Sequence, residues 1–510
     1  MATLNITTGI TLLAVEPGII LTRAIATFLH HQTRRFLFLS LRNARCLARQ
    51  WTGERGLLLL PDELLTEVVT QLEWQDILHV RQTCQRLNFA SRSLFVWRSI
   101  VERASPELLW LECPISTYSS NDLEFLFLRR KRAEVGYKMV SKGLAPRRQV
   151  IPLSLKDIAG PAHLVRGGRW LLLATYHGAI VYYDLEAESP VSRALTPEHE
   201  EGALISIAVD MDSTSPTLRF NLAVSRNFSI GRGDLRGVVE VWQVGLVLDG
   251  NNLGVGLHAE RLASFDQEPP GRCRRISLLG EQIAMTIFYM SHSEVYTVCV
   301  AWRSVPGPDY PKRILHPSIE AMCLLHPDVL LSIQTDGIKL TSCLSLPEVT
   351  TVPRGSGYIL QTWPFLTTLP FDSFFPSDLS ARFLFPDSCR FLVCANHQVL
   401  AVVIRSQANG TYHIETFKVL DVPESLYDVQ ICVSGDFLTF WPQDGDVHLQ
   451  QFSWEKNDAT SFPAAKFTAS PYYEPCFQLF DIISGRLLIP DAEGLALHDF
   501  TRFYSYLTSV

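Results

Sequence analysis

The chain has 510 residues, of which 47% are hydrophobic and 19% charged, and its formal net charge is −7. This length exceeds one ordinary domain, and the apolar content excludes a largely disordered protein. The acidic balance argues against an overall basic field, so we expect no nucleic-acid partner. The longest uncharged stretches, 1–15 and 355–371, are shorter than a membrane-spanning helix, so we expect no membrane insertion.

The first 55 residues contain seven arginines but only two acidic residues, Glu16 and Glu54. Arg-rich, acid-poor starts occur in mitochondrial transit peptides, but Pro17-Gly18 interrupts an amphipathic helix here. We therefore expect residues 1–55 to be a poorly ordered basic extension, with a targeting segment as the alternative.

The eleven cysteines are scattered from Cys46 to Cys476 without a C-x-x-C motif or zinc-ligand spacing. This pattern predicts reduced thiols in an intracellular protein of the cytoplasm, the nucleus or both, with no metal site and no cofactor.

Helical periodicity dominates residues 57–103. Pro61 suits the first turn of a helix that extends to about Leu72, and Asp76 is the expected N-cap of a second helix. A third, short helix is expected around Trp97. Three helices in about 45 residues bury little surface, so we expect surplus apolar residues such as Val69 to need another surface. The apolar stripes comprise Leu64, Leu65, Val68, Val69 and Leu72 on the first helix, and Ile77, Val80, Cys84 and Leu87 on the second.

This segment resembles an F-box, the motif that joins substrate receptors to SCF-type cullin ubiquitin ligases. The resemblance rests on Leu60-Pro61 opening the first helix, on Asp76-Ile77-Leu78, on the block 83–87 (TCQRL), and on Trp97 after a Ser-rich turn. It implies an all-α three-helix motif over 56–104 whose surface binds the helical adaptor subunit and, through it, cullin. A helical subdomain docked on its own chain is the alternative. The candidate adaptor-binding residues are Leu60, Pro61, Leu64, Leu65, Val68 and Ile77, whereas Cys84 and Trp97 are expected to pack within the motif.

Helical signals continue after the motif, so residues 105–146 are interpreted as a largely helical spacer. The basic run 129–132 is expected to lie where a helix ends, because cations there complement the helix dipole.

From residue 147 to 510 the pattern changes to pairs of short apolar strands joined by turns. Seven such hairpins recur about every 53 residues, close to the blade period of β-propellers. We therefore expect an all-β, seven-bladed propeller-like domain in an α+β multidomain chain, with 149–155 as the last outer strand. A pair of β-sandwiches is the alternative. The second strands of the hairpins begin at Gly178, Gly237, Glu294, Gly337, Gln398, Asp446 and Gly494.

Two of these strands, GAIVYYDL from Gly178 and GVVEVWQV from Gly237, also resemble the third strand of WD-type blades. Only Asp184 keeps the acid of the usual Trp-Asp pair, so the repeats are interpreted as degenerate WD-like units. Aromatic residues are concentrated in 358–385, where Trp363 and Phe365 are weak candidates for binding a substrate protein. Packing between blades is the favoured interpretation of these aromatic residues.

The sequence contains no H-E-x-x-H motif, no G-x-S-x-G motif and no phosphate-binding Gly-rich loop. We therefore expect a non-enzymatic substrate receptor of an SCF ligase that holds an unidentified target protein on its β domain. The alternatives are an F-box scaffold outside ubiquitination and a propeller-fold hydrolase. An N-terminal F-box with degenerate blades also resembles expanded F-box families of mushroom-forming fungi, in which targets are mostly not inferable from sequence.

Overall fold

A computed structural model describes residues 60–104, 111–140 and most of 145–503, with the longest gaps at 350–364, 422–429, 455–464 and 469–479. The chain divides into two compact units. The helical domain comprises residues up to 109 together with 115–128, and the β domain comprises 110–114 and 129–510. The basic extension expected at 1–55 lies outside the described residues.

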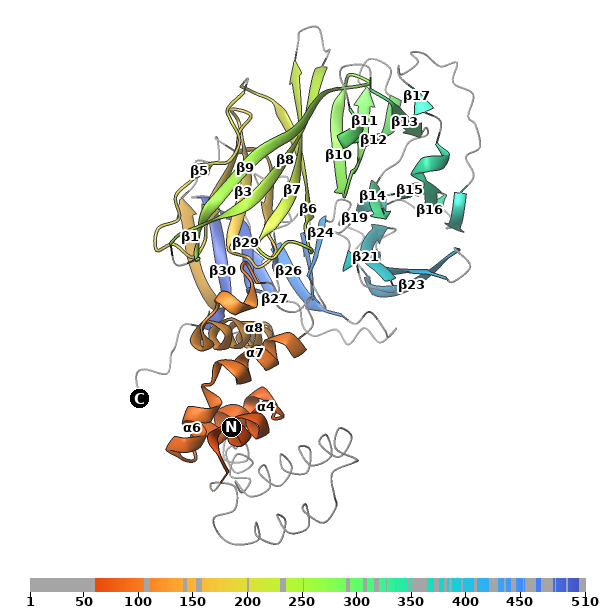
Figure 1. Cartoon of the computed structure of the whole chain (residues 1–510). Coiled ribbons are helices and arrows are strands. Elements are labelled where there is room, and N and C mark those ends of the chain that lie inside the picture. Colours follow the sequence, from red (N-terminus) through yellow and green to blue (C-terminus); the bar gives the residue numbers. More distant parts are fainter. Residues whose placement is uncertain are drawn as a thin grey trace, which may run out of the picture. The chain divides into compact units, whose positions relative to one another are not determined.

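The helical domain contains several short helices joined by short connections (Figure 1). One expected helix is in fact two, because Cys84 is extended (φ −157°, ψ 162°) and separates α5 from α6. Asp76 is not an N-cap: it lies in the first turn of α5, whose N-cap is Glu73. Thr83 and Cys84 have low helix propensity, which accounts for the break. The described elements are α4 (Asp62–Thr70), α5 (Trp74–Arg81), α6 (Gln85–Ser91), α7 (Leu94–Arg103), η3 (Ile115–Thr117) and the start of α8 (Ser120–Val140).

Trp97 is the centre of the helical core. Its side chain is fully buried, its ring packs against Phe127 with centroids 6.2 Å apart, and its Nε1 donates to the carbonyl of Ser91 at 3.0 Å. Arg81 donates two hydrogen bonds to the carboxylate of Glu124, at 2.6 and 2.9 Å. The first part of α8 therefore completes this core. Val69 is also buried within the chain, which corrects the expectation that it needs a further surface.

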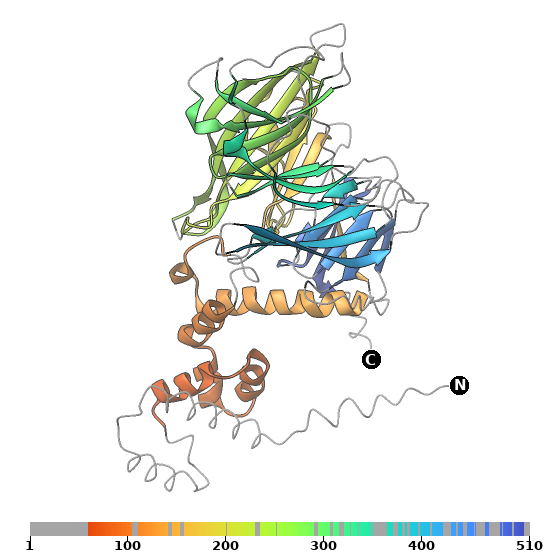
Figure 2. The same cartoon turned by 90° about the vertical axis from the view of Figure 1, so that its right-hand side faces the viewer.

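Helix α8 does not end at the basic run, contrary to expectation, but continues to Val140 (Figure 2). Arg129 donates to Glu186 at 2.5 Å, and Arg130 is buried beside Glu134. These arginines are therefore held by carboxylates instead of the dipole of a helix end.

The described part of the β domain forms seven antiparallel sheets, numbered here in chain order. Sheet 1 pairs β2 (Ile158–Leu164), β3 (Trp170–Thr175), β4 (Ile180–Asp184) and β5 (Arg193–Ala194). Sheet 2 pairs β6 (Leu204–Met211), β7 (Arg219–Ser229), β8 (Leu235–Leu248) and β9 (Gly254–Gln267). Sheet 3 pairs β10 (Arg272–Leu279), β11 (Gln282–Tyr289), β12 (Glu294–Ala301), β13 (Lys312–Leu315) and β17 (Glu348–Val349).

Sheet 4 pairs β14 (Ala321–His326), β15 (Val329–Gln334), β16 (Gly337–Ser342) and β18 (Phe365–Pro370). Sheet 5 pairs β19 (Pro376–Leu379), β21 (Ser388–Ala395), β22 (Gln398–Ser406) and β23 (Tyr412–Asp421), with β20 (Phe383–Leu384) on β21. Sheet 6 pairs β24 (Gln430–Ser434), β25 (Phe437–Trp441), β26 (Asp446–Gln451) and β27 (Ala465–Thr468). Sheet 7 pairs β28 (Phe480–Asp481), β29 (Arg486–Asp491), β30 (Gly494–Phe503) and β1 (Pro146–Pro152).

All seven expected hairpins are confirmed as neighbouring inner strands of these sheets. Glycine permits several of the turns. Gly337 has φ of +140°, and a Cβ there would lie 2.2 Å from the carbonyl oxygen of Leu369 on the neighbouring strand. The turn therefore needs glycine for both its backbone angle and its close approach.

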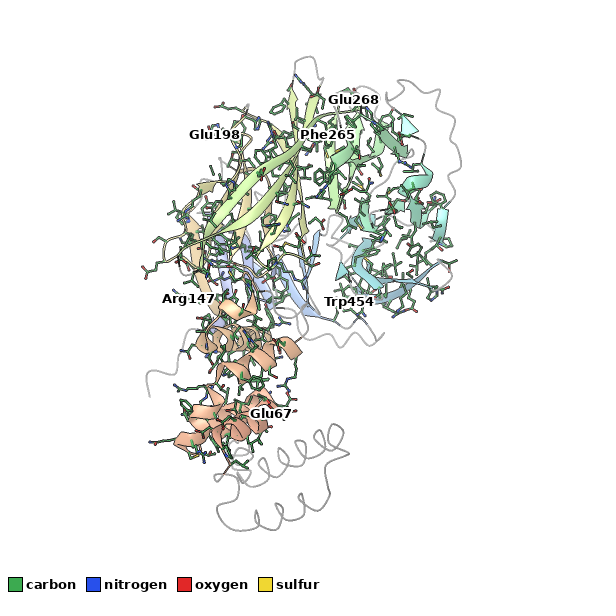
Figure 3. All side chains as sticks on the ribbon, in the orientation of Figure 1. Glu67, Arg147, Glu198, Phe265, Glu268 and Trp454 are labelled. Carbon is green, nitrogen blue, oxygen red and sulfur yellow. The ribbon has the colours of Figure 1, made fainter. Side chains whose placement is uncertain are left out.

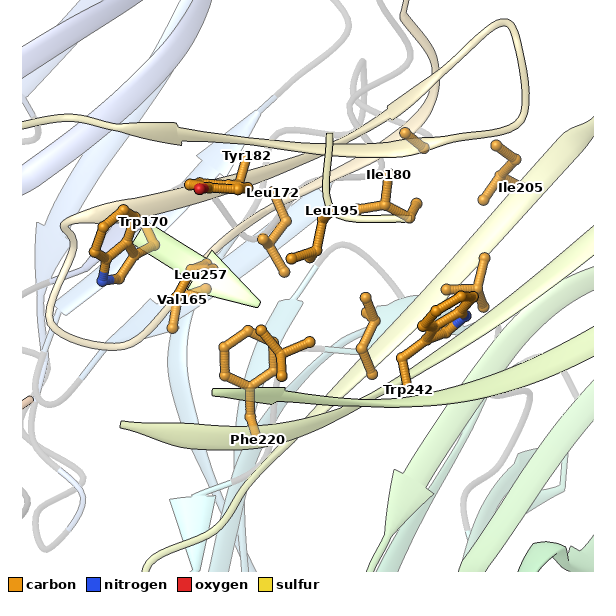
Figure 4. Close-up of a cluster of buried hydrophobic side chains, with 14 of the residues drawn as sticks. Val165, Trp170, Leu172, Ile180, Tyr182, Leu195, Ile205, Phe220, Trp242 and Leu257 are labelled. Carbon is orange, nitrogen blue, oxygen red and sulfur yellow. The ribbon is translucent and has the colours of Figure 1, made fainter. Parts of the chain in front are cut away.

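Hydrophobic clusters join each sheet to the next. Trp170 and Tyr182 of sheet 1 face Phe220 and Trp242 of sheet 2 (Figure 4). Equivalent clusters follow along the chain; Phe265 belongs to the one between sheets 2 and 3, and Trp454 to the one between sheets 5 and 6 (Figure 3).

The last sheet also packs against the first, through a cluster that includes Leu488 and Leu497 of sheet 7 and Leu171 and Leu173 of sheet 1. The expected outer strand is β1, which begins three residues before the expected start and pairs with β30. Each sheet thus packs on two neighbours. This is the arrangement of a propeller, whereas in a pair of sandwiches the sheets would pack two by two.

Candidate functional site

The candidate site begins at the corner where Leu60-Pro61 leads into α4. Pro61 is the N-cap residue of α4, with φ −52° and ψ 154°. Arg86 of α6 holds the corner, because its Nη2 donates to the carbonyl of Leu60 at 2.6 Å and its Nε donates to Asp62 at 2.8 Å. In the sequence, Arg86 is noted only within the block 83–87, and no local signal shows that it reaches back to residue 60.

The structure separates the six candidate adaptor-binding residues into two groups. Pro61 is exposed, and 46% of Leu64 is exposed, so both side chains are available to a partner. The other four are buried against the rest of the chain. They are Leu60, Leu65, Val68 and Ile77, and of these Leu65 and Ile77 have no exposed surface.

Further apolar side chains of the helical domain are exposed. Phe89 at the end of α6 is 74% exposed, and Leu94 and Phe95 in the first turn of α7 are 40% and 55% exposed. Apolar periodicity could not identify them, because it shows which residues are hydrophobic and not which of them face the chain's own core. These three side chains add to the exposed apolar surface of the helical domain.

The structure describes one of the two aromatic candidates of the β domain. Trp363 lies outside the described residues. Phe365 begins the edge strand β18, is half-buried, and has the Nζ of Lys339 4.7 Å from its ring centroid. This contact lies within sheet 4, which favours a packing role for Phe365.

No group of three or more His, Cys, Asp or Glu side chains in the described part of the chain is placed to bind a metal ion. Within the same part, no helix combines the length and the apolar character needed to cross a membrane.

The buried charges of the β domain instead hold strands together. Arg226 and Glu240 are paired on neighbouring strands of sheet 2, and both are almost fully buried. Arg226 also donates to the carbonyl of Gly178 at 2.7 Å, and Glu240 accepts from Trp242 and Arg261, each at 3.2 Å. Burial raises the pKa of Glu240, but the guanidinium of Arg226 outweighs it, so the pKa is lower than usual.

Short helices around a buried tryptophan, followed by seven sheets packed in series, define a chain with a small helical domain and a propeller-like domain. An F-box-like family model matches residues 57–103. The chain thus contains an F-box-like segment ahead of a propeller-like domain. No curated protein matches the chain.

Among solved structures, the chain is similar to the β-propeller domain of Cps50 (Swd1) from Myceliophteria thermophila. The two are 12% identical, with a TM-score of 0.40 over 69% of this chain and 99% of that one. The fold assignment of the β domain depends on its strand pairing and not on this likeness.

Proposed function

We propose that this chain is the substrate-receptor subunit of an SCF-type ubiquitin ligase. In this role the helical domain binds the adaptor subunit and, through it, cullin, while the β domain holds a target protein. The observation that carries the proposal is the F-box-like segment 57–103, whose described surface exposes Leu64, Phe89, Leu94 and Phe95.

The chain itself needs no catalytic residue in this role. Holding a target close to a charged conjugating enzyme raises their effective concentration, and this is sufficient to accelerate transfer. Packing of each sheet on two neighbours favours a rigid binding platform.

Replacing Leu64 by aspartate tests the adaptor surface. Because the side chain is half exposed, a charge there should leave the fold intact but prevent an apolar partner from covering it. We expect adaptor recovered with the purified chain to fall at least tenfold. Phe125→Asp is the matched control, since Phe125 is 54% exposed on α8 but lies outside residues 57–103. Undiminished adaptor in Leu64→Asp would exclude this surface.

Ubiquitination distinguishes a receptor from an F-box scaffold. Proximity labelling with the wild-type chain and with Leu64→Asp should list target candidates. A target whose ubiquitination requires the wild-type chain, and is lost with Leu64→Asp, supports the receptor role. Adaptor binding without any dependent ubiquitination would favour the scaffold.

Arg86 gives a second test of the adaptor surface. Its side chain is polar, but it orients the Leu60-Pro61 corner. Its ion pair with Asp62 is largely exposed, so Arg86→Ala should lower the free energy of unfolding by only about 1 kcal/mol. Adaptor affinity, measured by titration, should nevertheless fall about tenfold, and Arg86→Lys should not restore it, because lysine cannot reproduce the two directed contacts. An affinity that tracks stability alone would contradict this positioning role.

A further inference from the structure

The interface between sheets 3 and 4 differs in chemistry from an ordinary apolar seam. Its hydrophobic cluster contains Ala284 and Cys299 of sheet 3, and Leu330 of sheet 4 with Cys343 just beyond it. Side chains alternate between the two faces of a strand, so Thr286 and Thr297 share the face of Ala284 and Cys299. By the same alternation, Ser332, Lys339 and Thr341 share the face of Leu330. We call this interface the polar seam.

Two thiols meet across the polar seam. The Sγ atoms of Cys299 and Cys343 are 4.0 Å apart, and both residues are almost completely buried. Cys299 lies within β12, whereas Cys343 begins the 3₁₀ turn η6 (Cys343–Ser345) that follows β16. Cys343 therefore belongs to a turn outside the sheet ladder, so strand pairing does not hold it, and a disulfide requires the two sulfurs to approach to ~2.05 Å.

Arg313 holds this turn beside sheet 3. It is the cross-strand neighbour of Cys299 on β13, and its Nη1 donates to the carbonyl of Cys343 at 3.1 Å and to that of Leu346 at 3.4 Å. Arg313, which pairs with Cys299, thus fixes the backbone at Cys343.

The two thiols have different acidities. The hydrogen bond with Cys299 lowers the pKa of Cys343, and the guanidinium of Arg313 acts in the same direction. The hydrogen bond with Cys343, together with burial, raises the pKa of Cys299. Cys343 is therefore the more readily ionised sulfur, and Cys299 is the thiol that keeps its proton.

Three hydroxyl groups lie next to the thiols. The Oγ1 atoms of Thr286, Thr297 and Thr341 have no hydrogen-bond partner among the described residues, although all three residues are buried. Thr297 precedes Cys299 by two residues on the same face of β12, Thr341 precedes Cys343 by two residues in the chain, and Thr286 is the cross-strand neighbour of Thr297. Buried hydroxyls are hydrogen-bonding groups, so these three threonines make this part of the seam polar.

We propose that Cys299 and Cys343 are a redox modification site at which a hydroperoxide forms a reversible disulfide between sheets 3 and 4. The Cys343 thiolate attacks one peroxide oxygen, the O–O bond breaks, and the sulfur becomes a sulfenic acid while hydroxide leaves and takes up the proton lost by Cys343. The Cys299 thiol then displaces the sulfenic hydroxyl as water. Two thiols and one hydrogen peroxide thus give one disulfide and two waters.

The experiment uses the purified full-length chain treated with hydrogen peroxide. After free thiols are alkylated under denaturing conditions, the protein is digested without reduction and analysed by mass spectrometry. We expect a peptide pair linked through Cys299 and Cys343 that increases with peroxide, disappears with dithiothreitol and is absent from Cys343→Ser. The linked chain should also melt about 3–5 °C higher than the reduced chain, because the bond closes a loop of about 44 residues.

Cys273 is the internal control, because burial raises the pKa of its thiol to about 12 and it should remain fully alkylated. Two results would overturn the proposal: free Cys299 and Cys343 at peroxide levels that oxidise Cys273, or Cys343 oxidised to a sulfinic acid while Cys299 stays free. Because the peptides are measured in the wild-type chain, the result does not depend on the folding of Cys343→Ser. It is also independent of adaptor binding.

Discussion

Replacing Glu240 by alanine should lower the free energy of unfolding of the β domain by about 3–5 kcal/mol, because it leaves the guanidinium of Arg226 buried without its counter-charge. Arg226 would keep its contacts with the carbonyl of Gly178 and the hydroxyl of Thr196, but neither carries a charge. Urea denaturation followed by tryptophan fluorescence measures the loss. Arg261→Ala is the matched control: Arg261 also contacts Glu240 but is half exposed, so its loss should cost under about 1 kcal/mol.

The same pair predicts a pH dependence. The pKa of Glu240 is lowered in the folded chain, so its contribution to stability is fully present above the pKa of an unfolded glutamate, about 4.3. The contribution is lost as the pH falls through the lower folded value. The difference in unfolding free energy between wild type and Glu240→Gln should therefore be constant from pH 7 to about 5 and shrink in stronger acid. A difference that grows in acid would contradict the assignment.

Trp97→Ala should lower the free energy of unfolding of the helical domain by about 3–5 kcal/mol, because it removes the largest fully buried side chain of that domain and its contact with Phe127. It also leaves the carbonyl of Ser91 without the hydrogen bond from the indole. Hydrogen exchange of residues 60–104 in the full chain measures this loss, and the β domain should keep its protection.

Trp97→Phe gives the graded comparison, since it keeps most of the ring volume and loses the indole hydrogen bond. Adaptor binding should follow the stability of the helical domain in this pair of variants. In Leu64→Asp, by contrast, adaptor binding should be lost while exchange protection stays. A Trp97→Ala chain with unchanged protection would show that the buried ring does not hold the domain together.

The sequence predicted most of the fold because the β domain repeats one local pattern. Each hairpin places apolar strands on either side of a turn, as at Gly178 and Gly337, so seven independent signals supported the same repeat. The break between α5 and α6 was missed, because the apolar period continues through Cys84 although its backbone is extended.

The candidate site was predicted less completely. The motif identified the correct segment, but Leu65 and Ile77 are buried, whereas Phe89 and Phe95 are exposed. Which side of an amphipathic helix faces its own core depends on where its neighbours lie. Two contacts show the same limit: Arg86 bonds to Leu60, and Arg226 pairs with Glu240. Each joins residues that are well separated in the sequence, so no local sequence pattern could predict it.

The pairing of β1 with β30 has a consequence for the order in which the chain can fold. Pro152 pairs with Gly494, so the contact that completes sheet 7 spans about 340 residues and belongs to the slowest class of native contacts. At ~5–20 residues per second, synthesis leaves β1 without its partner for roughly 17–70 s after it is made. The described α-helices all precede β1, so the helical domain can fold during this interval. A chain truncated before β30 would therefore carry a complete docking motif on an unclosed β domain.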